Sequence, residues 1–180
     1  MNLKKFDPFN NRLARDIRNT LSKSFLESLA EKDASIFHKR AAEYLKQDLE
    51  QVYQEYVKIR LDKFDDVFVV IEHGQIHDEL KQAETLWEHG LYFEMHELLE
   101  RYWKCSSGIE RKALQGLIRA AGMKIHIESG NTKSAVTMGL KAHTDLQLYG
   151  KTLKRFDKLE SILAEIAETL AVMDSSSHTR

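Results

Sequence analysis

The sequence is poor in residues that break helices or cross-link chains. Its 180 residues include one proline, eight glycines and one cysteine. The single cysteine, Cys105, excludes an intrachain disulfide and is typical of proteins that work in a reducing compartment. The longest aliphatic or aromatic run is Val67–Ile71, far shorter than the ~20 residues that cross a bilayer. These shortages exclude disulfide-rich scaffolds, collagen-like chains and membrane-spanning helices.

The charge balance also excludes one class of function. Lys and Arg total 27, Asp and Glu total 28, and the formal net charge is −1. A chain this balanced does not bind nucleic acid through bulk electrostatics. The N-terminal segment MNLKKFDPFNNRLARDIRN has no apolar core of the kind that a signal peptide needs. We therefore expect a cytoplasmic protein, with neither nucleic acid nor a membrane as partner.

Amphipathic periodicity predicts helices along most of the chain. Between Pro8 and Glu31 the apolar residues recur every four positions, at Leu13, Ile17, Leu21, Phe25 and Leu29. We expect this helix to start at Pro8, because Asp7 can accept a backbone N–H there and proline fits a first turn. The same analysis predicts about seven helices with short connections, which is an all-α multihelical bundle of antiparallel helical hairpins.

The β-branched run Val67–Ile71 could form a strand in another setting. No second strand candidate exists to pair with it, so we interpret it as the buried end of a helix. The best candidate for a boundary between two parts of the chain lies nearby, at His73–Gln75. We expect an N-terminal helical part at 1–72, a central helical domain at 76–150, and a C-terminal helix at 157–173 that packs on the same core.

Two consecutive predicted helices carry a polar constellation. On the helix Leu91–Lys104 the polar residues lie in or beside the apolar stripe, and on Ile109–Ser129 they lie opposite it. A short turn joins the two helices, so we expect them to pack side by side and form one cluster: His96, Glu97, Glu100, Gln115, Arg119 and His126. Buried charge must be paired, and Glu100 with Arg119 is the natural ion pair.

Several interpretations of this cluster stay open. It can be a structural staple between two helices, or a pocket for a small polar or anionic ligand that Arg119 anchors. It can also hold a metal, because His96 and Glu100 are spaced to reach one ion, with His126 as third ligand. Against a metal, Arg119 repels cations, and the motifs of zinc proteases and di-iron bundles are missing. Glu97 or Glu100 as a catalytic base is the last alternative.

The residues around this cluster resemble a known family. The motifs, in order, are Phe-Glu-Met-His-Glu-Leu-Leu-Glu at 93–100 with Trp103, Leu-Gln-Gly-Leu-Ile at 114–118, His126, Gly130-Asn131 and Ala135. Together they look like the domain of unknown function 309 family of bacteria and archaea, over about 76–148. The N-terminal Phe-Asp-Pro-Phe-Asn-Asn-Arg at 6–12 and Asp-Ile-Arg-Asn at 16–19 are similar to longer members.

The resemblance implies an all-α multihelical fold and no biochemical activity. The chain departs from the family pattern at Arg119, where relatives often carry a second glutamine, which favours an internal ion pair there. We therefore predict a binding or interaction module built around the cluster, with a small polar ligand or a protein partner, and a homo-oligomer stays open. The alternative is a metal-assisted hydrolase-type enzyme that uses His96, Glu100 and His126. The sequence predicts no cofactor and no bound metal.

Overall fold

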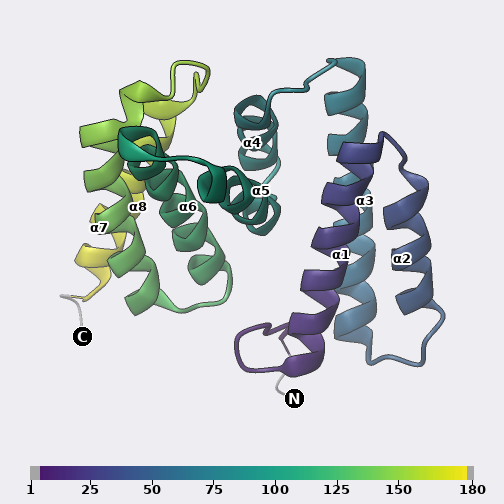
Figure 1. Cartoon of the computed structure of the whole chain (residues 1–180). Coiled ribbons are helices and arrows are strands. Elements are labelled where there is room, and N and C mark those ends of the chain that lie inside the picture. Colours follow the sequence, from purple (N-terminus) through teal and green to yellow (C-terminus); the bar gives the residue numbers. More distant parts are fainter. Residues whose placement is uncertain (1–4, 178–180) are drawn as a thin grey trace. The chain divides into compact units, whose positions relative to one another are not determined.

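The computed structural model describes residues 5–177. It shows eight α-helices and one 3-10 helix, and no strand among these residues (Figure 1). The all-α class is thus confirmed, and the helix number is close to the one predicted. In the described part of the chain, no helix combines the length and the apolar character that a bilayer span requires. The chain divides into two compact units, Met1–Ile76 and His77–Arg180.

The first unit contains α1 (Arg12–Glu31), α2 (Ser35–Leu45) and α3 (Gln51–His73), which pack against one another (Figure 1). Its core is aromatic. The ring of Phe25 stacks on Phe64 with 4.2 Å between centroids, and Phe37 meets both rings at 5.7 and 5.8 Å. All three side chains are fully buried, so one phenylalanine from each helix joins the three helices.

The expected start of the first helix at Pro8 is wrong. Helix α1 begins at Arg12, and the side chain of Asn11 accepts a hydrogen bond from the Ala14 N–H at 2.9 Å. The Asp7 carboxylate instead accepts from the backbone N–H groups of Phe9 and Asn10, which closes a turn around the proline. Asparagine and aspartate both cap helices and both close turns, and the sequence pattern alone does not decide between these uses.

The β-branched run Val67–Ile71 lies within α3, as predicted. Val67 and Ile71 are fully buried, whereas Val69 and Val70 are 49% and 42% exposed. Burial therefore follows the helical repeat, and the run is the core-facing stripe of an amphipathic helix plus two exposed valines.

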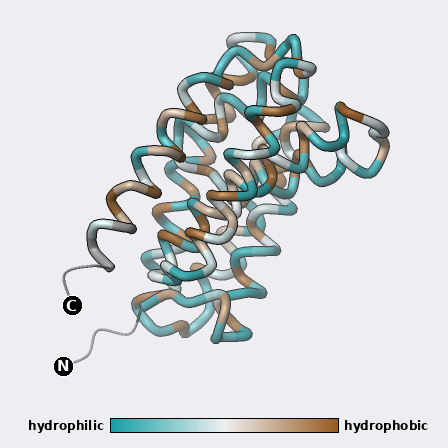
Figure 2. The backbone as a smooth tube through the Cα atoms, turned by 90° about the vertical axis from the view of Figure 1, so that its left-hand side faces the viewer, coloured by the Kyte–Doolittle hydropathy of each residue, from teal (hydrophilic) through white to brown (hydrophobic). Residues whose placement is uncertain are grey.

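The second unit contains α4 (Glu79–Glu88), α5 (Tyr92–Cys105), α6 (Gly108–Glu128), α7 (Thr132–Tyr149), the 3-10 helix η1 (Gly150–Thr152) and α8 (Leu159–Ser177). Helix α6 packs on α5 and, most extensively, on α7. Its buried positions include many small residues, namely Ala113, Gly116, Ala120, Ala121 and Gly122. Hydrophobic and hydrophilic residues alternate along the helices (Figure 2). Small side chains let helix backbones approach closely, and they allow α6 to pack between α5 and α7.

A buried carboxylate ties α4 to the start of α8. One oxygen of Glu84 accepts hydrogen bonds from the backbone N–H groups of Asp157 and Lys158, and the other lies 2.9 Å from the Lys81 ammonium. The Glu84 side chain is 9% exposed. Because charge-assisted hydrogen bonds satisfy the backbone at a helix start, Glu84 fixes where the C-terminal helix begins.

Candidate functional site

Helix α5 presents three polar side chains at one edge. The His96 Nδ1 lies 3.3 Å from the Glu97 Oε1, and the Glu100 Oε2 lies 3.8 Å from the Lys104 Nζ one turn further along. All three predicted residues are half-buried. The helix therefore keeps them at the border between the apolar stripe and solvent, where the sequence pattern puts them.

Helices α5, α6 and α7 line an open cavity of about 570 Å³ beside this edge. From α5 it is lined by His96 and Glu100, and from α6 by Gln115, Ile118, Arg119 and His126. Five of the six residues of the predicted cluster thus meet at one cavity. The sixth, Glu97, lies outside the lining, and its Oε1 lies 3.3 Å from the Nδ1 of His96.

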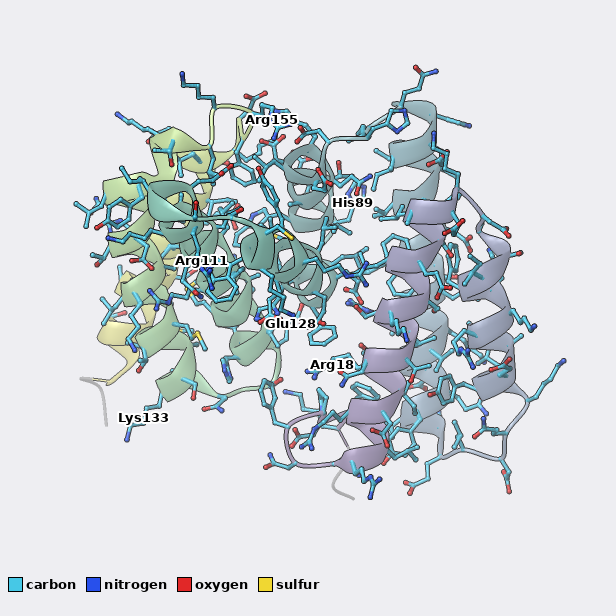
Figure 3. All side chains as sticks on the ribbon, viewed as in Figure 1. Arg18, His89, Arg111, Glu128, Lys133 and Arg155 are labelled. Atoms are coloured by element: carbon cyan, nitrogen blue, oxygen red, sulfur yellow. The ribbon has the colours of Figure 1, made fainter. Side chains whose placement is uncertain are left out.

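The third wall comes from α7 and was not part of the prediction. It is formed by Lys133, Ser134, Thr137, Met138 and Lys141. Lys133, labelled in Figure 3, lies in the first turn of α7 and its side chain extends away from the helix. The turn at Gly130-Asn131 is the signal that could have found this wall, because so short a connection folds α7 back along the polar face of α6.

Two glycines of α6 set how closely α7 approaches. A Cβ added at Gly122 would lie 3.3 Å from the Met138 Sδ, and one added at Gly116 would lie 2.9 Å from the Leu146 Cγ. Helix α7 therefore runs antiparallel to α6 with Gly122 level with Met138. The unfavourable glycine in the middle of α6 is explained by the close approach of a neighbouring helix.

The charges do not pair as predicted. The Arg119 Nη1 hydrogen-bonds to the Asp145 Oδ2 on α7, and Glu100 approaches Lys104 on its own helix. The expected Glu100–Arg119 pair is therefore replaced by two others. The physical reason is that α6 lies between α5 and α7, so that a long side chain on its polar face can reach either neighbour.

The cavity lining is predominantly cationic. Arg119, Lys133 and Lys141 carry positive charge, and Glu100 is the one carboxylate in the lining. Within the described residues, the ammonium groups of Lys133 and Lys141 have no ion-pair partner. Gln115 adds an amide that can donate to a ligand. The arrangement can therefore hold an anion by charge and by hydrogen bonds.

Burial lowers the pKa of His126 below its ordinary value. The physical cause is desolvation, which penalises the charged imidazolium. At neutral pH His126 is therefore uncharged, with one ring nitrogen as donor and one as acceptor. An anion that enters the cavity would oppose this effect and favour protonation.

One group of side chains could hold a metal ion. Possible ligand atoms of His96, Glu97 and Glu100 all lie within 4.8 Å of one another. In the part of the chain that the structure describes, His126 does not belong to this group. The set thus differs from the predicted His96–Glu100–His126 trio by having Glu97 in place of the distant histidine.

Helices α5 and α6, the turn after α6 and the first part of α7 hold the central motifs on which the family resemblance rests. Residues 80–138 match the model of a family described as Domain of unknown function (DUF309). The match confirms the resemblance over a somewhat shorter segment than expected, about a third of the chain. The DUF309 segment includes all six residues of the predicted cluster together with Lys133, Ser134, Thr137 and Met138, whereas Lys141 lies beyond it. No curated protein and no solved structure matches the chain.

Proposed function

We propose that this chain is a binding module for a small anionic ligand, held in the cavity between α5, α6 and α7. The observation that carries the proposal is the lining: three cationic side chains face one carboxylate around an open volume of about 570 Å³. Cavities that bind small molecules measure roughly 300–1,000 Å³, so the size fits a metabolite-sized ligand.

The distribution of partners supports an anion over a cation. Asp145 compensates Arg119, and Lys104 compensates Glu100, so both of these charges have a partner from the protein. The ammonium groups of Lys133 and Lys141 have no ion-pair partner among the described residues and are available to bind a ligand. A cleft with an excess of one charge raises the local concentration of oppositely charged molecules.

The test is a calorimetric titration of the full chain at low salt with a panel of small anions: inorganic phosphate, malonate, suberate and octanoate. We expect at least one to bind, and Lys141→Gln to weaken its binding about fivefold, because an ion pair screened by solvent contributes up to about 1 kcal/mol. Lys151→Gln is the matched control, since Lys151 is exposed on η1 and lies outside the lining. If no anion of the panel binds, or if both variants act alike, the proposal is wrong.

The second candidate function is a metal-assisted hydrolase, and the group His96, Glu97 and Glu100 favours it. Imidazole and carboxylate are ligands that Zn²⁺ accepts, and a three-residue set leaves a position for water. That ion would lie at the α5 wall, next to the cationic wall that receives the anion. The nearby positive charges weaken cation binding, and for this reason the anion-binding function ranks first.

Titration with Zn²⁺ tests the second candidate. If the group binds the ion, His96→Asn and Glu97→Gln each remove most of the affinity, because each takes away one ligand. His126→Asn leaves it unchanged if the ligands are those of α5, and lowers it if the predicted trio is correct. The exposed His73 supplies the control variant His73→Asn. Equal affinity in all four variants would exclude a specific site.

A further inference from the structure

A lysine lies at each end of the cavity. Gly122 lies level with Met138 across the antiparallel pair α6–α7. Three residues earlier on α6 comes Arg119, and three residues later on α7 comes Lys141. In the other direction, His126 comes four residues after Gly122, opposite the first turn of α7 that carries Lys133. Arg119 thus shares one end with Lys141, and His126 shares the other with Lys133.

The two ends are separated along the helix axis. Lys133 and Lys141 are two turns apart on α7, and at a rise of 1.5 Å per residue their Cα atoms are on the order of 12 Å apart along the axis. The α7 wall between them consists of Ser134, Thr137 and Met138, and the thioether of Met138 faces Gly122. The cavity therefore presents a lysine at each end and, between them, no charged side chain on α7.

Met138 makes the middle adaptable. Its thioether is flexible and polarizable, and it contacts a position on α6 that has no side chain. An apolar chain of a ligand can lie along Met138 without displacing a polar group from its partner. An anionic group in this middle section would have no cationic side chain beside it, because the lysines lie at the ends.

We propose that the ligand is a linear dianion whose two acidic groups are joined by an apolar chain. One acidic group lies between Lys133 and His126, and the other lies between Lys141 and Arg119. This inference rests on the proposed anion-binding function and specifies its ligand class. The acidic groups are carboxylates or phosphates, since lysine and arginine bind both.

The two ends act together on such a ligand. Once one acidic group is bound, the other is held near its own end at a high effective concentration, so a dianion of matching length binds more tightly than either half alone. A short dianion carries the same charge but reaches only one end. Length, and not total charge, is therefore the property that the cavity selects.

Calorimetry with three carboxylates tests this directly. Suberate has two carboxylates on a long chain, malonate has two on a short chain, and octanoate has one on a long chain. We expect suberate to bind at least about tenfold more tightly than the other two. A bisphosphonate with the same chain length as suberate shows which acidic group is preferred.

Variants at each end complete the test. Lys133→Met and Lys141→Met should each reduce the affinity for suberate to about that for octanoate, whereas Lys151→Met should leave it unchanged. Far-UV circular dichroism checks that all three variants fold. If malonate or octanoate binds as tightly as suberate, or if Lys133→Met has no effect, the two-ended ligand is wrong although anion binding stands. If no anion binds, the proposed function fails as well.

Discussion

A close approach between α6 and α7 at Gly116 gives the sharpest test of the fold around the cavity. A Cβ added at Gly116 would lie 2.9 Å from both the Cδ2 and the Cγ of Leu146 and 3.1 Å from the Cβ of Asp145. Leu146 is 1% exposed, so its branched side chain has little room to move away. Gly116→Ala should therefore push α7 outward.

The size of the effect follows from two opposing terms. Replacing glycine by alanine inside a helix stabilises it by about 1 kcal/mol. Overpacking a tight contact costs about 1–3 kcal/mol, and three contacts below 3.2 Å place Gly116 toward the upper end. We expect a net destabilisation of about 1–2 kcal/mol. Gly122→Ala is the matched control, because its Cβ would approach only the flexible thioether of Met138, at 3.3 Å. That variant should be stabilised by up to about 1 kcal/mol.

Urea denaturation followed by tryptophan fluorescence measures the difference. The chain has two tryptophans, Trp87 and Trp103, and both lie in the second unit, so the signal reports on the unit that contains α6 and α7. The reasoning is refuted if Gly116→Ala is as stable as the unsubstituted chain, or if it is more stable than Gly122→Ala. Either result would mean that Leu146 and Asp145 on α7 can make room for a Cβ at Gly116 at little cost.

Three further predictions concern single charges. Asp145→Asn should tighten the binding of an anion about twofold to fivefold in a calorimetric titration, because it releases Arg119 from its protein partner. Weaker binding of the anion would mean that Asp145 is needed to position the Arg119 guanidinium. Glu84→Gln should lower the free energy of unfolding, measured in urea, by about 1–3 kcal/mol, because it removes the charged acceptor at the start of α8. An unchanged midpoint of the urea denaturation curve would contradict this prediction. Burial lowers the pKa of His126, so the unfolded chain binds its proton at higher pH than the folded chain. Stability should therefore fall as the pH drops below about 6.5, and less so in His126→Asn; the same loss in both proteins would show that other groups cause it.

Helical periodicity was sufficient to predict the fold class. The apolar spacing of Ile17, Leu21 and Phe25 indicates the core-facing stripe of α1, and all three are buried. The strand-like run Val67–Ile71 lies in a helix as predicted, because a lone strand has no partner for its backbone groups, but the run is buried only in part, since Val69 and Val70 are exposed. The start of α1 was not predicted, because Asn11 and Asp7 offer the same kind of acceptor and only the folded backbone selects one of them.

The candidate site was predictable in part. The short turn after Cys105 and the apolar stripes of α5 and α6 bring His96, Glu100 and Arg119 to one cavity. The ion pairs were not predictable from these two helices, because the partner of Arg119 lies on α7. Helical phase gives the face of a residue, but it does not say which of two neighbouring helices covers that face.

The observed ion pairs also help to distinguish a structural link between two helices (a staple) from a binding site. A staple requires Glu100 and Arg119 to bond to each other, and such a bond would draw α5 and α6 together over the space between them. Each residue instead has its own partner, Lys104 for the glutamate and Asp145 for the arginine. The cavity beside Glu100 and Arg119 stays open. Lys133 and Lys141, which line it from α7, form no ion pair with α5 or α6 among the described residues. The Arg119–Asp145 pair therefore links α6 to α7, and Lys133 and Lys141 remain available to the anion that we propose.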